Sequence, residues 1–113
     1  MALISLDKVK MNVIKTAPNG VVNSQTIFTF SQKENLVSAS YEGGKIYQGF
    51  LVGYLTRGKL FFSYCQLQVD GKIDNGQSIC SLSFDENKKL ILTETFTWSS
   101  RENDGGVNIF REI

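Results

Sequence analysis

The chain has 113 residues, 42% of them hydrophobic, a length that allows one domain with a single small core. Twelve Lys and Arg are nearly balanced by eleven Asp and Glu along the chain, which excludes a basic surface for nucleic acid. Histidine is absent, so zinc hydrolysis and Ser-His or Cys-His catalysis are excluded, and we expect no metal, no other cofactor and no catalytic residue.

The N-terminal residues are expected to begin the first strand rather than to form a targeting segment. They lack a basic stretch followed by a long apolar run, and no segment approaches the ~18 apolar residues of a membrane span. We therefore expect a cytoplasmic protein without membrane contacts. In that reducing compartment, Cys65 and Cys80 are expected to be free thiols.

Clusters of Gly, Asn, Asp and Pro interrupt the chain at regular intervals, and the segments between them are rich in Val, Ile, Thr, Phe and Tyr. Alternation with a period of two, as in residues 90–98, is typical of half-buried strands. Pro18 lies in the first turn, where it disturbs no strand pairing. In chain order, the predicted strands cover residues 4–15, 23–31, 36–42, 45–56, 59–69, 77–85, 89–99 and 107–113.

The short connections predict an all-β fold, an eight-stranded antiparallel up-and-down meander barrel with residues 1–113 as its single domain. Pairing the eighth strand with the first removes the unpaired edges, and about eight strands enclose space for side chains or one small ligand. A two-sheet sandwich is the alternative, although it would normally need longer crossovers.

Two glycine turns predict the register of the central strands. A two-residue loop at Gly43-Gly44 would place Glu42 opposite Lys45, with this charged pair outside the barrel. A second two-residue loop at Arg57-Gly58 would carry the same alternation of inward and outward residues into the strand over residues 59–69. The inward residues are then expected to be Val37, Ala39, Tyr41, Ile46, Gln48, Phe50, Val52, Tyr54, Phe61, Ser63, Cys65 and Leu67.

The loop over residues 86–88 predicts an acid inside the barrel. With Asn87 or its neighbour in the left-handed conformation, Phe84 faces Leu90, and the same ladder places Cys80 opposite Glu94 on the inward side. A carboxylate in an apolar interior loses solvation, so its pKa should rise.

Glu94 is interpreted in two ways. In the first it anchors a ligand, with Trp98 as a stacking wall near the mouth and tyrosine hydroxyls as donors. In the second it forms an internal salt bridge or hydrogen-bonded plug with Arg101 or Arg111. The candidate ligand-binding residues are Tyr41, Tyr54, Glu94, Trp98, Arg101 and Arg111.

The two cysteines lie symmetrically about the midpoint between Lys72 and Ile73, so a hairpin centred there would bring them together as a disulfide. Turns centred at residues 70–71 or 75–76 would separate them. A redox role is not expected, because Cys65 and Cys80 lack the C-x-x-C spacing of a redox motif.

Several short motifs resemble a family of small bacterial proteins of no established activity. They are Tyr41-x-Gly43-Gly44-x-Ile46-x-x-Gly49, Tyr64-Cys65-Gln66, Gly76-x-Ser78-x-Cys80 and Glu94-x-Phe96-x-Trp98. Some members carry the name N-acetylglutamate synthase, so the resemblance implies that label for this chain. The predicted architecture is similar to that of calycins, the avidin, lipocalin and fatty-acid-binding class, which implies binding of a small molecule in the barrel.

Three functional hypotheses follow. The first is a non-enzymatic module that binds a small, partly apolar molecule in the barrel. The second is a solid barrel that forms a homodimer through outward residues, expected to include Tyr47, Leu51, Leu55, Phe62 and Tyr64. The third, ranked last, is an enzyme with Glu94 as acid or base and Arg101 or Arg111 stabilising an anion.

Overall fold

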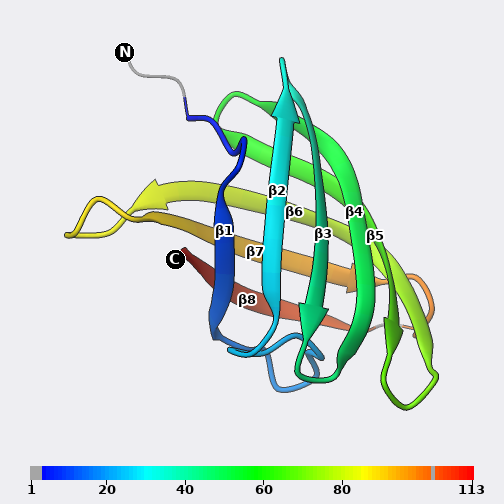
Figure 1. The fold of residues 1–113 in the computed structure, drawn as a ribbon. Coiled ribbons are helices and arrows are strands. Elements are labelled where there is room, and N and C mark those ends of the chain that lie inside the picture. The colour runs from blue at the N-terminus through cyan, green and yellow to red at the C-terminus, as the bar shows by residue number, and fades with distance from the viewer. Residues whose placement is uncertain (1–3, 103) are drawn as a thin grey trace.

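The computed structural model describes residues 4–102 and 104–113, which form a closed antiparallel barrel (Figure 1). Each strand pairs with its neighbours in the chain, and the eighth pairs with the first, so the sandwich alternative is wrong. The strands are β1 (Lys10–Lys15), β2 (Ile27–Lys33), β3 (Leu36–Gly43), β4 (Ile46–Thr56), β5 (Lys59–Gln68), β6 (Ile73–Phe84), β7 (Leu90–Trp98) and β8 (Gly105–Glu112).

The strand boundaries follow the turn residues, with the largest differences at β1, β2 and β6. β2 begins at Ile27, four residues later than predicted. Residues 4–9 were expected to be part of the first strand, but they precede it and close one end of the barrel, where the side chain of Leu6 is fully buried. The backbone N–H of Leu6 donates to Gln32 Oε1 at 2.8 Å. β6 begins four residues earlier than predicted, at Ile73, which lies opposite Leu67 of β5.

The loop between β4 and β5 has the predicted form. Thr56 lies opposite Lys59, and both loop residues have positive φ, 52° at Arg57 and 76° at Gly58. Glycine accepts this conformation without steric cost, and the resulting turn matches the twist of the flanking strands.

The hairpin between β3 and β4 differs from its prediction. Gly43 lies opposite Ile46, so the loop is Gly44-Lys45, one residue later than expected. Ile46 then lies opposite Gln68 and Gln48 opposite Leu67, which leaves Tyr47 as the extra residue of a β-bulge. A bulge exchanges the two faces of a strand beyond it.

The predicted inward face is therefore correct before the bulge and wrong after it. Val37, Ala39, Tyr41 and Ile46 are buried as expected. Beyond Tyr47, three residues of β4 that were expected to point inward point outward: Phe50, Val52 and Tyr54. On β5 the inward positions are likewise taken by the alternate residues, and not by the expected Phe61, Ser63, Cys65 and Leu67. The residues buried there are Leu51, Leu60, Phe62, Tyr64, Gln66 and Gln68.

The barrel core combines these side chains with Met11 and Val13 of β1, Phe28 and Phe30 of β2, and the inward residues of β7 and β8. Within the described part of the chain, no helix is long and apolar enough to cross a membrane.

Candidate functional site

Glu94 lies inside the barrel, as predicted, with 6% of its surface exposed. The register from Phe84–Leu90 through Cys80–Glu94 is the expected one, and Lys88 takes the left-handed conformation at φ 63°. Glu94 Oε2 accepts a hydrogen bond from Ser78 Oγ at 2.6 Å, and Oε1 accepts one from Asn108 Nδ2 at 3.0 Å. These partners come from β6 and β8, on either side of β7.

Burial raises the pKa of Glu94 above its ordinary value, and the hydrogen bonds from Ser78 and Asn108 offset only part of this effect. Both bonds are to neutral groups. Among residues 4–102 and 104–113, Glu94 forms no ion pair with Lys or Arg. The carboxyl group is therefore inclined toward its protonated form, which can donate as well as accept a hydrogen bond.

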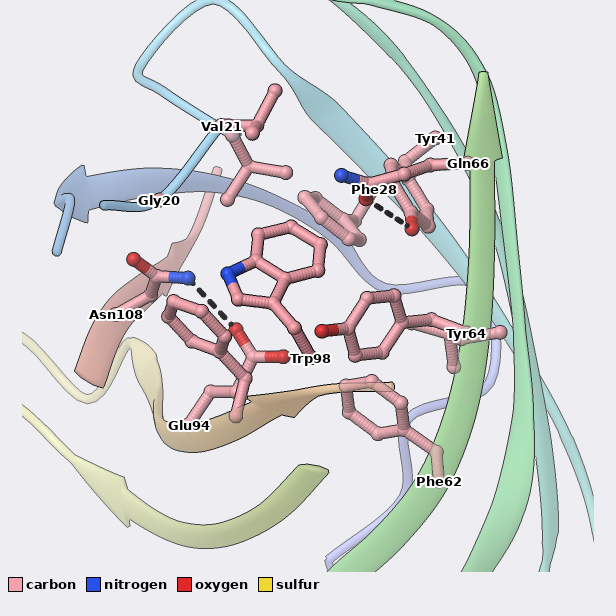
Figure 2. Close-up of a pocket in the computed structure, with 13 residues that line it drawn as sticks. Gly20, Val21, Phe28, Tyr41, Phe62, Tyr64, Gln66, Glu94, Trp98 and Asn108 are labelled. Carbon is pink, nitrogen blue, oxygen red and sulfur yellow. Dashed lines mark hydrogen bonds between the residues drawn. The ribbon is translucent and has the colours of Figure 1, made fainter. Parts of the chain in front are cut away.

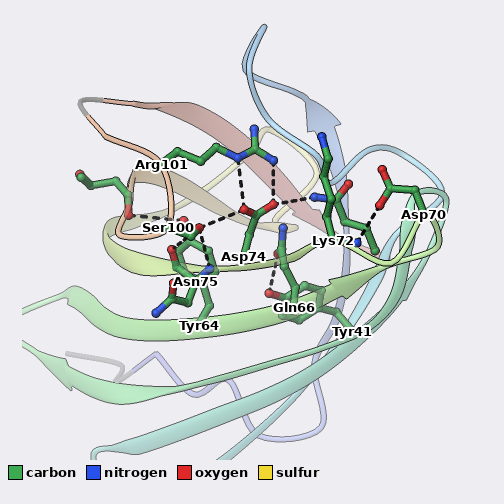
Figure 3. Close-up of polar contacts among 11 residues, drawn as sticks. Tyr41, Tyr64, Gln66, Asp70, Lys72, Asp74, Asn75, Ser100 and Arg101 are labelled. Carbon is green, nitrogen blue, oxygen red and sulfur yellow. Dashed lines mark hydrogen bonds and ion pairs between the residues drawn. The ribbon is translucent and has the colours of Figure 1, made fainter.

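The two arginines predicted as partners of Glu94 bind other acids, so the salt-bridge interpretation is wrong. Arg111 Nε lies 2.9 Å from Asp85 Oδ2 at the far end of β7. Arg101 lies near the mouth and pairs with Asp74 (Figure 3).

The Arg101–Asp74 pair holds one side of the barrel mouth. Arg101 Nη2 lies 2.7 Å from Asp74 Oδ2, and Arg101 Nε lies 3.2 Å from Oδ1. Asp74 also accepts hydrogen bonds from Ser100 Oγ and Gln68 Nε2. Burial opposes ionisation of Asp74, but the bonds from Arg101 and Ser100 hold its pKa below the ordinary value. The guanidinium group lies 4.5 Å from the centre of the Trp98 ring, where a cation–π contact forms.

A small cavity lies beside Glu94 near this mouth (Figure 2). Its volume is about 20 Å³, enough for about one water molecule. The walls are mainly aromatic: Tyr64 meets Trp98 edge-on at 5.7 Å between ring centres, and Phe96 meets Trp98 at 5.4 Å. The residues that line the cavity are Gly20, Val21, Val22, Phe28, Tyr41, Leu51, Phe62, Tyr64, Gln66, Glu94, Phe96, Trp98 and Asn108.

Two buried donors in the cavity wall lack hydrogen-bond partners among the described residues. They are Gln66 Nε2 and Trp98 Nε1. The Tyr41 hydroxyl donates to Gln66 Oε1 at 2.8 Å, and the amide nitrogen Gln66 Nε2 is the end left without a partner. An unmade hydrogen bond at a buried donor costs ~1–3 kcal/mol, so this wall favours a group that can accept hydrogen bonds.

Glycines on the neighbouring strands make room for the aromatic walls. Tyr41 lies opposite Gly49, and a Cβ atom at Gly49 would lie 2.2 Å from the Tyr41 ring. Tyr64 lies opposite Gly76, where an added Cβ would lie 2.4 Å from the Tyr64 hydroxyl oxygen. The same pairing of ring with glycine recurs for Phe62 with Gly53 and for Phe96 with Gly106.

Three of the six predicted ligand-binding residues, Tyr41, Glu94 and Trp98, line the cavity. Arg101 contacts Trp98 at the mouth, whereas Arg111 lies elsewhere. Tyr54 points outward with 47% of its surface exposed and stacks on Phe61, because the bulge at Tyr47 exchanges the faces of β4. The sequence reasoning missed Tyr64, Gln66, Ser78 and Asn108 as functional residues. Placing the bulge correctly would have found the first two.

The cysteines are separate free thiols, as expected. The β5–β6 turn is centred on Asp70, so Cys65 lies opposite Asn75 and Cys80 opposite Leu60, and the disulfide alternative is wrong. Cys65 is exposed, whereas burial raises the pKa of the Cys80 thiol.

Comparison with known proteins gives one match. No curated protein and no solved structure matches the chain. A family model described as Avidin-like protein matches residues 4–113, which include all eight strands and every residue of the cavity. The chain therefore belongs to the Avidin-like protein family.

Proposed function

We propose that the protein binds a small, largely uncharged molecule at the Glu94 end of the barrel, without catalysing a reaction on it. One observation carries the proposal: two unpartnered donors, on Gln66 and Trp98, and a buried carboxyl group without a cation line the same cavity. Buried polar groups in a folded protein are normally satisfied, so the two free donors beside this carboxyl group favour a polar ligand.

The chemistry of these groups restricts the ligand class. The two N–H donors require acceptor atoms such as a carbonyl oxygen, and Glu94 pairs best with an N–H or O–H group. The aromatic walls contact a flat apolar portion. An amide or urea carries both the acceptor and the donor, so we propose compact molecules of this type as ligands.

Family membership supports binding within the barrel, because the calycin class to which avidin belongs holds small molecules there. The matching family's description carries no enzyme name. We therefore do not include N-acetylglutamate synthase activity in the proposal.

We expect small amides, lactams and ureas to bind and to change the fluorescence of Trp98, the single tryptophan of the chain. Gln66→Leu should weaken binding about tenfold, because removing a hydrogen bond at a buried site costs on the order of 1.4 kcal/mol. Titration of each compound by fluorescence, with native mass spectrometry for stoichiometry, measures the effect.

The matched control for that experiment is Gln77→Leu, the same substitution on the outer face of β6. Equal affinities of the Gln66→Leu and Gln77→Leu proteins, or no binding by any member of the panel, would contradict the proposal.

A second candidate function, self-association, is favoured by the outer face of β3 to β6. Leu36, Tyr54, Phe61 and Ile79 lie opposite one another in a single row across these four strands. We call this row the outer apolar row. Tyr54 and Phe61 stack with ring centres 5.4 Å apart, and Leu36 and Ile79 are more than half exposed. The dimer was predicted on the outer face of these strands, but with other residues. Because of the bulge, the expected Leu51, Leu55, Phe62 and Tyr64 do not lie on this face, and the residues next to them along each strand do.

On one side of the outer apolar row, the next two rows contain no charged residue: Ser38, Val52, Ser63 and Gln77, followed by Ser40, Phe50, Cys65 and Asn75. The row on its other side, Thr56, Lys59 and Ser81, contains one lysine at the edge of this face. The exposed apolar side chains of the three rows present on the order of 500 Å². With the polar residues around them, this area approaches the ~800 Å² per partner of a stable interface. We propose a second copy of the chain as the occupant, paired face to face by a twofold axis.

We expect Ile79→Lys to dissociate this dimer, because it places a charge in the outer apolar row. Ile14→Lys is the matched control, since Ile14 on the opposite strand β1 is exposed to a similar extent, 54% against 52% for Ile79. Light scattering measures the mass, and a bismaleimide that joins the exposed Cys65 thiols reports the face. A monomeric wild-type protein, or equal effects of the two lysines, would exclude this interface.

A further inference from the structure

Residues 17–22, in the connection between β1 and β2, lie across the end of the barrel that holds Glu94. We call them the lid segment. Ala17, Val21 and Val22 are buried although the segment belongs to a loop, and Val21 lies over the Trp98 indole (Figure 2). A turn closed by Gly20 N–H donating to the Ala17 carbonyl oxygen at 2.9 Å gives the segment a defined shape, with Pro18 in the position that favours such turns.

One buried side chain joins the lid segment to the acid. The backbone N–H of Ala17 donates to Asn108 Oδ1 at 2.8 Å, and Asn108 Nδ2 donates to Glu94 Oε1 at 3.0 Å. A backbone N–H can only donate, so the Asn108 oxygen must face Ala17 while the lid is closed. This orientation directs the amide nitrogen of Asn108 at Glu94.

Two further contacts hold the lid segment against β8 and the loop before it. Asn19 Nδ2 donates to Asp104 Oδ1 and to the Gly105 carbonyl oxygen. Beneath it, a Cβ atom at Gly106 would lie 2.7 Å from Ala17 Cβ, so the close seat of the lid requires glycine there. The Asn19 bonds are only partly buried, so this end of the segment can open without global unfolding, while the buried Ala17, Val21 and Val22 hold the rest against the barrel.

We infer that the lid segment opens and closes over the cavity as a unit, and that Asn108 is a positioning residue which couples its closed state to Glu94. When the lid is closed, the cavity of about 20 Å³ admits about one water molecule. A larger molecule therefore enters only when the lid is open, and this consequence for ligand entry rests on the proposed function. The motion itself and the coupling do not require a ligand.

The opening is tested on the ligand-free protein by amide hydrogen exchange at Ala17 and by acrylamide quenching of Trp98. Asn19→Ala removes a lid contact without touching Glu94, and we expect about fivefold faster exchange at Ala17 with stronger quenching, while strand amides are unchanged. Asn12→Ala is the matched control, because Asn12 Nδ2 bonds Ser24 O, outside the lid segment, at 3.4 Å. Equal exchange at Ala17 in the two variants would overturn the lid.

The coupling is tested at Glu94, which does not contact the lid segment through a hydrogen bond. Glu94→Met removes the acceptor of Asn108 Nδ2 and should speed exchange at Ala17 several-fold. Glu94→Gln keeps an acceptor and should leave the rate within twofold of the wild-type value. Strand amides in each variant report any change in global stability. Equal exchange rates at Ala17 in Glu94→Met and Glu94→Gln, relative to those strand amides, would overturn the role of Asn108. A lid that opens as described in a protein that binds no amide or urea would refute only the proposed function.

Discussion

Glu94→Gln is expected to make the protein more stable at pH 8, by about 1–3 kcal/mol, the range for relieving an imperfectly compensated buried polar group. The amide can accept the bond from Asn108 through its oxygen and donate to Ser78 through its nitrogen, so both contacts of Glu94 have an equivalent. The substitution therefore removes the free-energy cost of burying a charged carboxylate and keeps both hydrogen bonds.

The gain should depend on pH in a defined direction. Because burial raises the pKa of Glu94, its contribution to stability is complete below the ordinary carboxyl pKa and is lost as the pH rises through the folded-state value. The advantage of Glu94→Gln should therefore grow between pH 5 and pH 8. Asp74 acts in the opposite sense: its pKa is lowered, so its contribution is lost as the pH falls through the folded-state value.

Guanidinium chloride unfolding followed by Trp98 fluorescence between pH 5 and pH 8 measures this effect. Ser78→Ala is the informative comparison, since it keeps the carboxyl group and removes one of its two hydrogen-bond donors. That variant should be less stable than the wild type across the range. A loss of several kcal/mol on Glu94→Gln would instead mean that the charged carboxylate itself holds the barrel together.

Gly49→Ala is expected to destabilise the protein by about 2–4 kcal/mol, at or above the upper end of the usual cost of overpacking a core. The new Cβ would lie 2.2 Å from Tyr41 Cε2, so the ring must leave its place above Phe28, with which it stacks at 4.3 Å between ring centres. Displacing Tyr41 also removes its hydrogen bond to Gln66. Ligand affinity should therefore fall together with stability.

The control for Gly49→Ala is Gly58→Ala, in the tight turn between β4 and β5. Gly58 has φ of 76° and open space around its Cα, so alanine there costs only backbone strain, about 1 kcal/mol. Combining Gly49→Ala with Tyr41→Leu should recover part of the loss, since leucine leaves room for the added methyl group. Strictly additive effects of these two substitutions in guanidinium chloride unfolding would contradict a direct clash.

The proposed function and the proposed lid opening are linked, because the barrel interior is nearly filled when the lid segment is closed. Beneath the closed lid segment the barrel holds only a small cavity. Aromatic rings fill the space made by the glycines that lie opposite them on the neighbouring strands. Val21 and Val22 contribute apolar contacts to the same cavity. A ligand would replace these contacts at the roof and would find Gln66, Trp98 and Glu94 at the wall.

The number of strands, their order and the position of the acid follow from the sequence alone. Turn residues mark the strand ends, and the loop over residues 86–88 determines the β6–β7 register, so Glu94 and Trp98 were correctly placed inside. The closed meander follows from short connections and from the need to pair the edge strands. None of these features depends on a contact between distant strands other than the closure itself.

The identity of the residues that surround Glu94 depends on packing between strands and does not follow from the sequence pattern. The extra residue at Tyr47 exchanges the faces of β4 and, through the tight turn after it, of β5. Apolar residues occupy both faces there, as Phe50 next to Leu51 shows, so alternation of hydrophobicity cannot distinguish the two registers. The register is chosen by packing across strands, where Tyr41 needs the space of Gly49. The lid segment likewise has no periodic signal, because Asn108 and Gly106, which hold it, lie about 90 residues further along the chain.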